Sequence, residues 1–301
     1  MEYNGVINVY KEKGYTSHDV VAIIKRTLKT KAGHTGTLDP EAEGVLPIVL
    51  GKSTRLADYI MAEDKIYEAE IHFGVTTDTC DMTGNVLVDN RPASVSKAQL
   101  LGVLEKFKGE VNQIPPMYSA IKINGEKLYN LARKGIEVER KKRLVTIHDI
   151  ELVEMQSEYA RILVSCSKGT YIRTLCEDVG KELGCGAAMG ELLRRASGEF
   201  KLESAIKIDE IKALATENRV GDYVIAPEEF FKECSKVYAK EEAYKFIRNG
   251  NKLSADLVES AGLEQGQKYR LYANNQFIGL YILDELGVFK PEIILWDLGK
   301  V

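Results

Sequence analysis

The hydrophobic and polar residues follow two different periods along the chain, and each period predicts one kind of element. Strict alternation over residues 66–74, "IYEAEIHFG", places Tyr67 on an apolar face and Glu68 on a polar face, which is typical of a half-buried strand. Short apolar runs at 5–11 and 160–167 predict two further strands. We therefore expect a sheet with Tyr67 on its inward face.

A helical period occurs in three other segments. Apolar residues recur at helical spacing in residues 17–29, 96–107 and 170–184. Ser17 is expected to be the N-cap of the first helix, and Ser96 with Gln99 to form a capping box at the start of the second. Gly184 is expected to end the third helix.

The order of these elements indicates an α+β fold. Strands and helices are interleaved irregularly and no βαβ unit repeats, so we expect a mixed, largely antiparallel sheet. Residues 113–143 are rich in Pro, Gly, Lys and Arg, which predicts an exposed insertion. Short strands separated by Asn, Gly and Gln follow from about Lys232. The expected domains are residues 1–231 and a small β-rich module, 232–301.

Length and composition are compatible with this division. The chain has 301 residues, 45% of them hydrophobic, which suits one large domain and a small one. No apolar run is long enough to span a bilayer, and the start of the chain does not resemble a signal peptide. The 5 cysteines include no C-x-x-C pair, which favours reduced thiols over a disulfide framework or a zinc site. We expect a cytoplasmic protein.

The charge distribution permits RNA binding without requiring it. The net charge is −4, but basic and acidic side chains are equal in number up to Lys201, so the acidic excess lies in the last third of the chain. Two basic clusters, at 140–143 and 194–195, lie within the neutral part. A local patch of this kind can bind a compact RNA even in an acidic protein.

Two common kinds of site are excluded by spacing. "GVLPIVLGKST" ends like a P-loop, but its first glycine, Gly44, is too far from Gly51, and the residues between them are mostly apolar, which predicts a buried strand and a turn. The 4 histidines show no metal-ligand spacing, and "TTDTCDMTG" lacks the glycine and glutamate of an EF-hand loop, so a turn stabilised by Asp and Thr is expected. We predict no metal site.

One carboxylate remains, in "GHTGTLDPEAEGVLP". Asp39 stands among glycines and threonines, and Pro40 restricts it to extended backbone geometry. Such a carboxylate is either a nucleophile or base, or the cap of a turn, and the local pattern leaves both open. Arg173 lies near the start of a helix, where a positive charge meets the helix dipole unfavourably, so it is either paired with a carboxylate or an ordinary surface arginine.

The motifs taken in order resemble one enzyme family. "AGHTGTLDPEAEGVLPI", "KIY", "GVTTDTCDMTG", "QIPPMYSAIKINGEKLYNLARKG", "CSKGTYIRTL" and "LLRRASGEF" resemble the bacterial tRNA pseudouridine-55 synthases, the TruB family. The resemblance covers roughly the first two thirds of the chain. It implies a pseudouridine synthase fold, and a PUA-like RNA-binding module at the C-terminus. It also implies that the protein isomerises uridine 55 in the TΨC loop of tRNA.

The resemblance also implies roles for individual residues. Asp39 matches the nucleophile, Arg173 the arginine that pairs with it, and Tyr67 the tyrosine that stacks on the flipped uridine. His34, Tyr171 and Leu193 match positions that contact the flipped base. Candidates for contact with the RNA backbone are Lys11, Arg140, Lys141, Lys142, Arg143, Arg194 and Arg195. Lys11 lies in a Lys-Glu-Lys-Gly stretch where the family has Lys-Pro-x-Gly.

The implied partner is the T-arm stem-loop of tRNA, and we expect a monomer without cofactor, metal or obligatory protein partner. The order of steps stays open between attack at C1′, attack at C6 and removal of the C2′ proton. Alternative interpretations are a non-catalytic RNA-binding protein, the same enzyme with another RNA substrate, and a nucleoside hydrolase. The hydrolase would need a second carboxylate, for which Glu41 and Glu43 are the candidates.

Overall fold

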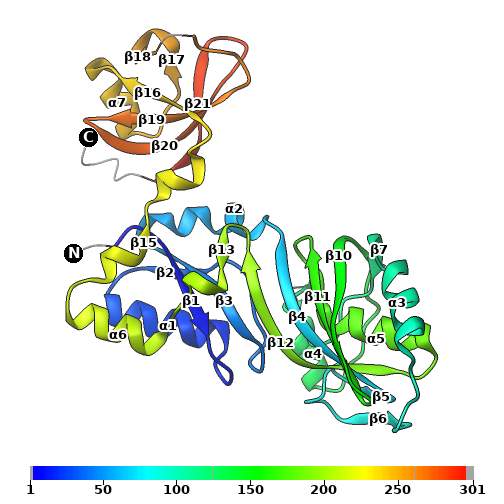
Figure 1. Ribbon diagram of the computed structural model, residues 1–301. Coiled ribbons are helices and arrows are strands. Elements are labelled where there is room, and N and C mark those ends of the chain that lie inside the picture. The colour runs from blue at the N-terminus through cyan, green and yellow to red at the C-terminus, as the bar shows by residue number, and fades with distance from the viewer. Residues whose placement is uncertain (1–2, 124, 261, 296–301) are drawn as a thin grey trace.

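The structure is a computed structural model that describes residues 3–123, 125–260 and 262–295. Figure 1 shows a long, curved sheet flanked by helices, with a smaller β-rich module above one of its ends. The chain passes from the large part into the module through the segment that follows β15 (Val224–Ile225).

The large sheet carries the predicted strands and is mixed but largely antiparallel, as expected. Its 11 strands include the path β14 (Ile206–Lys207), β1 (Gly5–Lys11), β3 (Glu43–Leu50), β12 (Ala187–Ser197), β4 (Lys65–Phe73), β11 (Tyr159–Cys166), β10 (Arg143–Met155), β7 (Gly109–Gln113). Off this path, β2 (Ala32–His34) pairs with β3, β13 (Phe200–Lys201) with β12, and β15 with β1. Only β1–β14 and β12–β3 are parallel among the described pairs of this sheet. The alternation in β4 is confirmed, because Tyr67, Ala69, Ile71 and Phe73 are buried.

Helices cover this sheet in groups. The helices are α1 (Ser17–Leu28), α2 (Ala57–Met61), α3 (Lys97–Lys106), α4 (Leu128–Arg133), α5 (Ile172–Leu183), α6 (Ile208–Thr216) and α7 (Tyr244–Arg248). Figure 1 shows α1 and α6 together at one end of the sheet and α3 and α5 at the other. Their apolar faces and the inward face of the sheet form one hydrophobic cluster that includes Ile24, Leu46, Ile71 and Leu175.

The helix ends are mostly those predicted from sequence. Ser96 and Gln99 form the expected capping box of α3, and Gly184 ends α5 in the left-handed conformation. The prediction for α1 was wrong by one residue, because Thr16 is the N-cap and shares a capping box with Asp19. Ser17 is instead buried, and its hydroxyl is used elsewhere.

Two small hairpins project from the main sheet. β5 (Val75–Thr77) pairs with β6 (Val86–Asp89), and the turn between them contains the Asp- and Thr-rich stretch. β8 (Lys122–Ile123) pairs with β9 (Glu126–Lys127) inside the predicted insertion, which runs from the end of β7 to the start of β10 and also contains α4. Most of its described residues are exposed or half-buried.

The C-terminal module has a sheet and a core of its own. Its 6 strands are β17 (Leu253–Ser254), β21 (Val288–Ile294), β20 (Gln276–Leu283), β19 (Lys268–Ala273), β16 (Ser235–Ala239) and β18 (Val258–Glu259). Its core includes Val237, Tyr281 and Phe289. This barrel-like sheet has the architecture expected of a PUA-like module. No helix within the described ranges is both long and apolar enough to cross a membrane.

Candidate active site

Asp39 lies on a loop between β2 and β3 that is fastened on its N-terminal side by α1. The Ser17 hydroxyl accepts a hydrogen bond from the Leu38 N–H at 2.9 Å and donates one to the Leu38 carbonyl at 3.1 Å. Both bonds are buried. The backbone just before Asp39 is therefore held at two points by one side chain, which limits where the carboxylate can go.

Two buried cations hold the rest of this loop. Lys11 Nζ donates to the carbonyl oxygens of Pro40 at 3.1 Å and Ala42 at 2.5 Å. Arg194 Nε donates to Val45 O at 2.7 Å, and its Nη2 donates to Gly36 O at 3.1 Å. Backbone carbonyl oxygens on both sides of Asp39 are thus hydrogen-bonded to side chains of the sheet strands β1 and β12.

This geometry corrects two predictions. Lys11 and Arg194 were expected to contact the RNA backbone, but their exposed fractions are 0% and 1%. A cation buried this deeply and bonded to backbone carbonyls cannot reach a phosphate. Burial lowers the pKa of Lys11 to about 8, because the charged form loses its hydration. Neither position could be recognised as interior from sequence, since Lys and Arg are usually exposed.

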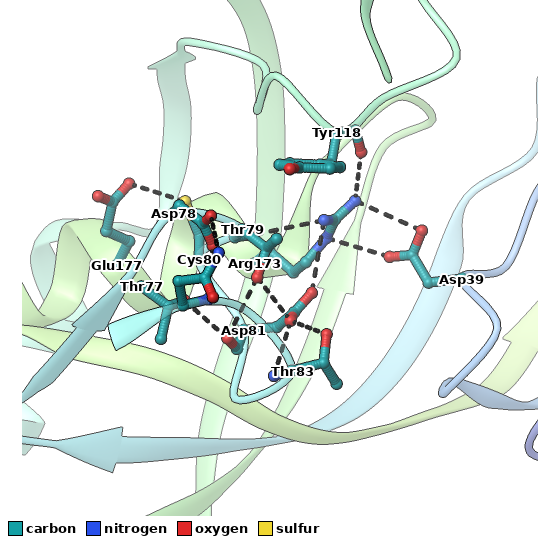
Figure 2. A network of polar contacts seen from close by, with 11 residues as sticks. Asp39, Thr77, Asp78, Thr79, Cys80, Asp81, Thr83, Tyr118, Arg173 and Glu177 are labelled. Carbon is teal, nitrogen blue, oxygen red and sulfur yellow. Dashed lines mark hydrogen bonds and ion pairs between the residues drawn. The ribbon is translucent and has the colours of Figure 1, made fainter. Parts of the chain in front are cut away.

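Arg173 faces Asp39 across the site, as expected from the sequence (Figure 2). Its Nε lies 3.1 Å from Asp39 Oδ2, and its Nη2 lies 3.4 Å from Oδ1. The Arg173 side chain is only 7% exposed, whereas the Asp39 side chain is 40% exposed. The arginine therefore forms the inner wall, and the carboxylate presents an accessible edge.

Further acceptors fix the guanidinium in this position. Arg173 Nη2 also donates to Tyr118 O at 2.8 Å, and Nη1 donates to Thr79 O at 3.3 Å and to Asp81 Oδ2 at 3.4 Å. Figure 2 shows Asp39 on one side of the guanidinium, Thr79 and Asp81 on the other, and the Tyr118 carbonyl beyond its end. A planar, multidentate arrangement of this kind suits Arg and not Lys.

Asp81 is a site residue that the sequence analysis missed. Its Oδ1 accepts hydrogen bonds from the hydroxyls of Thr79 at 2.8 Å and Thr83 at 2.6 Å, and from the Thr83 N–H at 3.0 Å. The prediction of a turn stabilised by Asp and Thr is confirmed. That turn also delivers a second carboxylate to Arg173, which its threonine-rich composition did not reveal.

The local charges act on Asp39 in opposite directions. The surrounding protein removes water from its inner side and raises the pKa of the carboxyl, the nearby Arg173 and Lys11 oppose that rise, and Asp81 adds to it. The pKa of Asp39 therefore lies above that of an exposed aspartate. Removal of Arg173 would raise it further.

Tyr67 and His34 both lie near Arg194, which holds the loop of Asp39. Tyr67 is buried on β4 directly opposite Arg194 of β12, and burial raises the pKa of its hydroxyl, against the influence of Arg194. His34 ends β2 and its Nδ1 accepts from the Gly36 N–H at 3.3 Å, so the neutral ring carries its proton on Nε2. Burial lowers the pKa of His34 to about 4, helped by His18 and Arg194.

Two other predicted base contacts have different outcomes. Tyr171 is the half-buried N-cap of α5, and burial raises the pKa of its hydroxyl, a rise opposed by the nearby Arg143 and Arg173. Leu193 pairs with Glu68, which puts its side chain on the sheet face opposite Tyr67. The structure therefore does not bring the Leu193 side chain into this group, and that prediction is wrong. The ring of His18 lies 5.2 Å from that of His34.

The remaining basic candidates are divided between two surfaces. Lys141, Lys142 and Arg143 are exposed at the end of the insertion. Arg140 is bonded instead to Pro115 O at 3.1 Å and to Glu137 at 3.0 Å, so its guanidinium is already engaged. Arg195 pairs with Glu68 at 2.7 Å on the face opposite Tyr67.

Within the part of the chain that the structure describes, no three His, Cys, Asp or Glu side chains gather as metal ligands.

Comparisons with known proteins agree on one family. The family model described as TruB family pseudouridylate synthase (N terminal domain) matches residues 25–172. The model described as tRNA pseudouridylate synthase B C-terminal domain matches residues 173–230. The tRNA pseudouridine synthase B of Clostridium perfringens (strain SM101 / Type A) is 44% identical over 97% of this chain and 99% of that protein. The enzyme of the same name from Clostridium tetani (strain Massachusetts / E88) is 45% identical over 92% of this chain and 94% of that protein.

Solved structures show the same fold. A Cbf5-Nop10-Gar1 complex contains a chain with a TM-score of 0.71 and 28% identity, covering 98% of this chain and 86% of that one. An H/ACA RNP bound to a substrate RNA containing 2′-deoxyuridine contains one with a TM-score of 0.69 and 26% identity, covering 97% and 85%.

Proposed function

Because the chain belongs to the TruB family of pseudouridylate synthases, we propose that it isomerises uridine 55 in the TΨC loop of tRNA with Asp39 as the nucleophile. Formation of pseudouridine in tRNA is the activity shared with the relatives of that name. The observation that carries the assignment to Asp39 is its two-point pairing with Arg173 on a loop fastened by Ser17, Lys11 and Arg194.

The chemistry needs a carboxylate and a confined base. The N1–C1′ bond of uridine breaks, a C5–C1′ bond forms, C5 loses a proton and N1 gains one, so the product is an isomer. Protons exchange with water but no water is consumed and no electron is supplied, so the proposed reaction needs neither metal nor redox cofactor. Attack at C1′, attack at C6 and removal of the C2′ proton all begin with the ionised Asp39 carboxylate, which Arg173 favours.

The target base must leave the stacked T-loop to reach Asp39. Tyr67 would pack against the extruded uridine from the sheet side, and Tyr171 would contact it from the start of α5. His34, neutral at physiological pH because of its lowered pKa, would occupy the space that the base leaves. A neutral ring suits this role, because it stacks without adding charge near Asp39.

Binding of the T-arm is proposed to use the insertion and the C-terminal module. Lys141, Lys142 and Arg143 are exposed and suited to phosphate contact. We propose residues 1–231 as the catalytic domain and 232–301 as a PUA-like RNA-binding domain, since the module has its own sheet and core. Residues 1–2 and 296–301 lie outside the described residues. The enzyme would act as a monomer in the cytoplasm.

The hydrolase alternative gains no support from the geometry. Glu41 and Glu43 line a surface recess with Lys13, Tyr10 and the outward face of the sheet. Glu43 accepts from the Tyr10 hydroxyl at 3.3 Å, and Glu41 lies 4.0 Å from Lys13. Neither of these two carboxylates faces the Asp39–Arg173 pair, so neither is in place to activate water there. Asp81, the other carboxylate at the pair, is engaged by Arg173, Thr79 and Thr83.

The test uses a T-arm stem-loop transcript with tritium at C5 of its uridines, incubated with wild-type protein and with Asp39→Asn. We expect the wild type to release tritium to water and to leave pseudouridine at the target position. Asp39→Asn should bind the transcript normally and release no tritium. Asp58→Asn, a change at an exposed aspartate of α2, is the matched control and should retain wild-type activity.

Each other outcome points to a different interpretation. Salt-sensitive binding by the wild type without tritium release would support a non-catalytic RNA-binding protein. Release of free uracil would support a hydrolase. Full activity in Asp39→Asn would overturn the assignment of the nucleophile while leaving the activity intact.

A further inference from the structure

Gln113 makes an unusual connection at the start of the helix that carries Arg173. Its side chain is 1% exposed at the end of β7, 58 residues before Tyr171 in the chain. Gln113 Oε1 accepts a hydrogen bond from the Tyr171 N–H at 3.0 Å, and Nε2 donates to the Tyr171 carbonyl at 3.3 Å. One buried amide thus pairs with both backbone groups of a single residue, as a neighbouring strand would.

The position of this contact gives it a mechanical role. Tyr171 is the N-cap of α5, and no side-chain cap of its own holds that end. Helix ends are the parts that fray first when their backbone groups lack partners. Gln113 provides the partner of the Tyr171 N–H from a different element, and it adds a second donor to the Tyr171 carbonyl, which also accepts from the Leu175 N–H at 3.1 Å. Gln113 is as fully buried as a core side chain.

Arg173 lies two residues after Tyr171, within the first turn of α5. The segment that begins at Gln113 also reaches the other end of this side chain, because Tyr118 O accepts from Arg173 Nη2 at 2.8 Å. The backbone from which Arg173 projects and the guanidinium itself are therefore both held by the same stretch, 113–118. A loss at either contact changes how the guanidinium meets Asp39.

We propose that Gln113 is a positioning residue for the isomerisation, which holds the first turn of α5 so that Arg173 stays aligned with Asp39. This inference rests on the proposed function of the Asp39–Arg173 pair. Gln113 touches neither the substrate nor Asp39. It acts through the backbone of Tyr171.

The role has a signature that simple stabilisation lacks. The charged groups that face Asp39 are Arg173, Asp81 and Lys11. Arg173 holds the pKa of Asp39 down, whereas Asp81 raises it. When the first turn of α5 loosens, Arg173 loses its alignment and the pKa of Asp39 rises. The acid limb of the kcat/KM profile, which reports the free enzyme, then moves to higher pH.

The experiment compares Gln113→Met with Gln99→Met. Methionine keeps the length of glutamine and removes both hydrogen bonds. Gln99 also caps a helix, because it completes the capping box of α3, but α3 carries no residue of the candidate site. Pseudouridine formation on the T-arm stem-loop is measured across pH, together with amide hydrogen exchange of residues 171–175 and thermal unfolding.

We expect Gln113→Met to lower kcat/KM by about tenfold or more, since small misplacements of catalytic groups are costly. Its acid limb should move to higher pH, and the amides of residues 171–175 should exchange faster. Gln99→Met should leave both the rate and the limb unchanged. If Gln113→Met does not fold, Gln113→Asn, which keeps an amide but shortens it, is expected to show the same shifts to a smaller degree.

Several results would overturn the inference. One is a Gln113→Met variant with the kcat/KM of the wild type. Another is a variant whose kcat/KM falls while the acid limb of its pH profile stays in place. A third is a variant in which only KM rises and kcat is unchanged. An inactive wild type would instead remove the proposed function, so the two failures are distinguishable.

Discussion

The geometry of the candidate site depends on how one arginine contacts several acceptors at once. Arg173 reaches both oxygens of Asp39, one oxygen of Asp81 and the carbonyls of Thr79 and Tyr118. The planar guanidinium has five N–H donors in a fixed fork, and each of its three nitrogens lies near an acceptor of the protein. An ammonium group has fewer donors and no plane, so it can neutralise Asp39 without aligning it.

Arg173→Lys is therefore expected to lower kcat/KM by about a hundredfold, because alignment is lost although the charge is kept. The same change weakens the interaction that opposes the raised pKa of Asp39. Since the proposed active form of Asp39 is the carboxylate, the acid limb of the pH–rate profile should move to higher pH. The measurement is tritium release from the T-arm stem-loop as a function of pH.

Arg161→Lys provides the control for this change. Arg161 also lies among carboxylates, at 2.7 Å from Glu70 and 3.7 Å from Glu154, but on the opposite face of the sheet from Tyr67. Its substitution should leave the rate and the acid limb unchanged. A near-normal rate for Arg173→Lys across neutral pH would contradict the role given to the ion pair.

At this scale the sequence was informative about chemistry and uninformative about burial. The pairing of Asp39 with Arg173 could be predicted, because both residues occupy motifs of the TruB family. Lys11 and Arg194 were predicted to be exposed but are buried. The sequence does not indicate that backbone carbonyl groups will surround a cation. Asp81 and Ser17 act through contacts with distant segments, and no local pattern records such contacts.

At the scale of elements, helix α5 is fixed by a close approach to the sheet. A Cβ added at Gly180 would lie 2.1 Å from the Ala187 N and 2.4 Å from the Ala187 Cβ. Backbone atoms cannot move aside as a flexible side chain can. Gly102 in α3 is different, because a Cβ there would meet nothing within 4 Å. Both glycines lie inside helices, so the same substitution separates the cost of contact from helix propensity.

Gly102→Ala should stabilise the protein by about 0.5–1 kcal/mol, because alanine restricts the unfolded chain and favours the helix. Gly180→Ala should destabilise it by about 3 kcal/mol, because α5 must move away from β12. The free energy of unfolding, taken from denaturant titration, is the measurement. Changes of the same sign in both variants would contradict the close packing of α5 on the sheet. Gly180→Ala should also reduce activity, since α5 carries Arg173.

The regular elements could be predicted because their side chains face one consistent environment. The strand at 66–74 and the helices at 96–107 and 170–184 have one buried face each, which imposes a period. The N-cap of α1 is Thr16 and not Ser17, because the Ser17 hydroxyl forms hydrogen bonds with the Leu38 backbone. The short elements of the insertion, β8, β9 and α4, have too few residues to show a period.

At the scale of the whole molecule, a third hydrophobic cluster joins the two parts. Val45, Leu56 and Phe200 from the large part pack with Phe231, in the segment that follows β15, and with Leu280 of the C-terminal module. Three aromatic rings extend this contact. The ring centroid of Phe231 lies 5.2 Å from that of Tyr59 and 6.2 Å from that of Phe277. Figure 1 shows the module above α2, where this contact lies. The proposed RNA-binding module is therefore held against the large part by an apolar contact.

The charge of the whole molecule limits how it can bind RNA. A net charge of −4 provides no general attraction for tRNA, so affinity must come from local groups. Each phosphate contact that releases a counterion adds to the dependence of the binding constant on salt. Lys142 is exposed at the end of the insertion, beside a groove that is lined in part by Ile114 and Val138. Its substitution tests whether the insertion contacts phosphates.

Lys142→Ala should weaken tRNA binding most at low salt and should reduce the slope of log K against log salt concentration by about 0.7–0.9, the contribution of one phosphate contact. The value of kcat should be unchanged, because Lys142 does not touch the Asp39–Arg173 pair. Lys212→Ala, at an exposed lysine paired with Asp209 on α6, should alter neither quantity. Equal slopes for wild type and Lys142→Ala would place the phosphate contacts elsewhere. The insertion would then hold Arg173 through Tyr118 without gripping the RNA backbone.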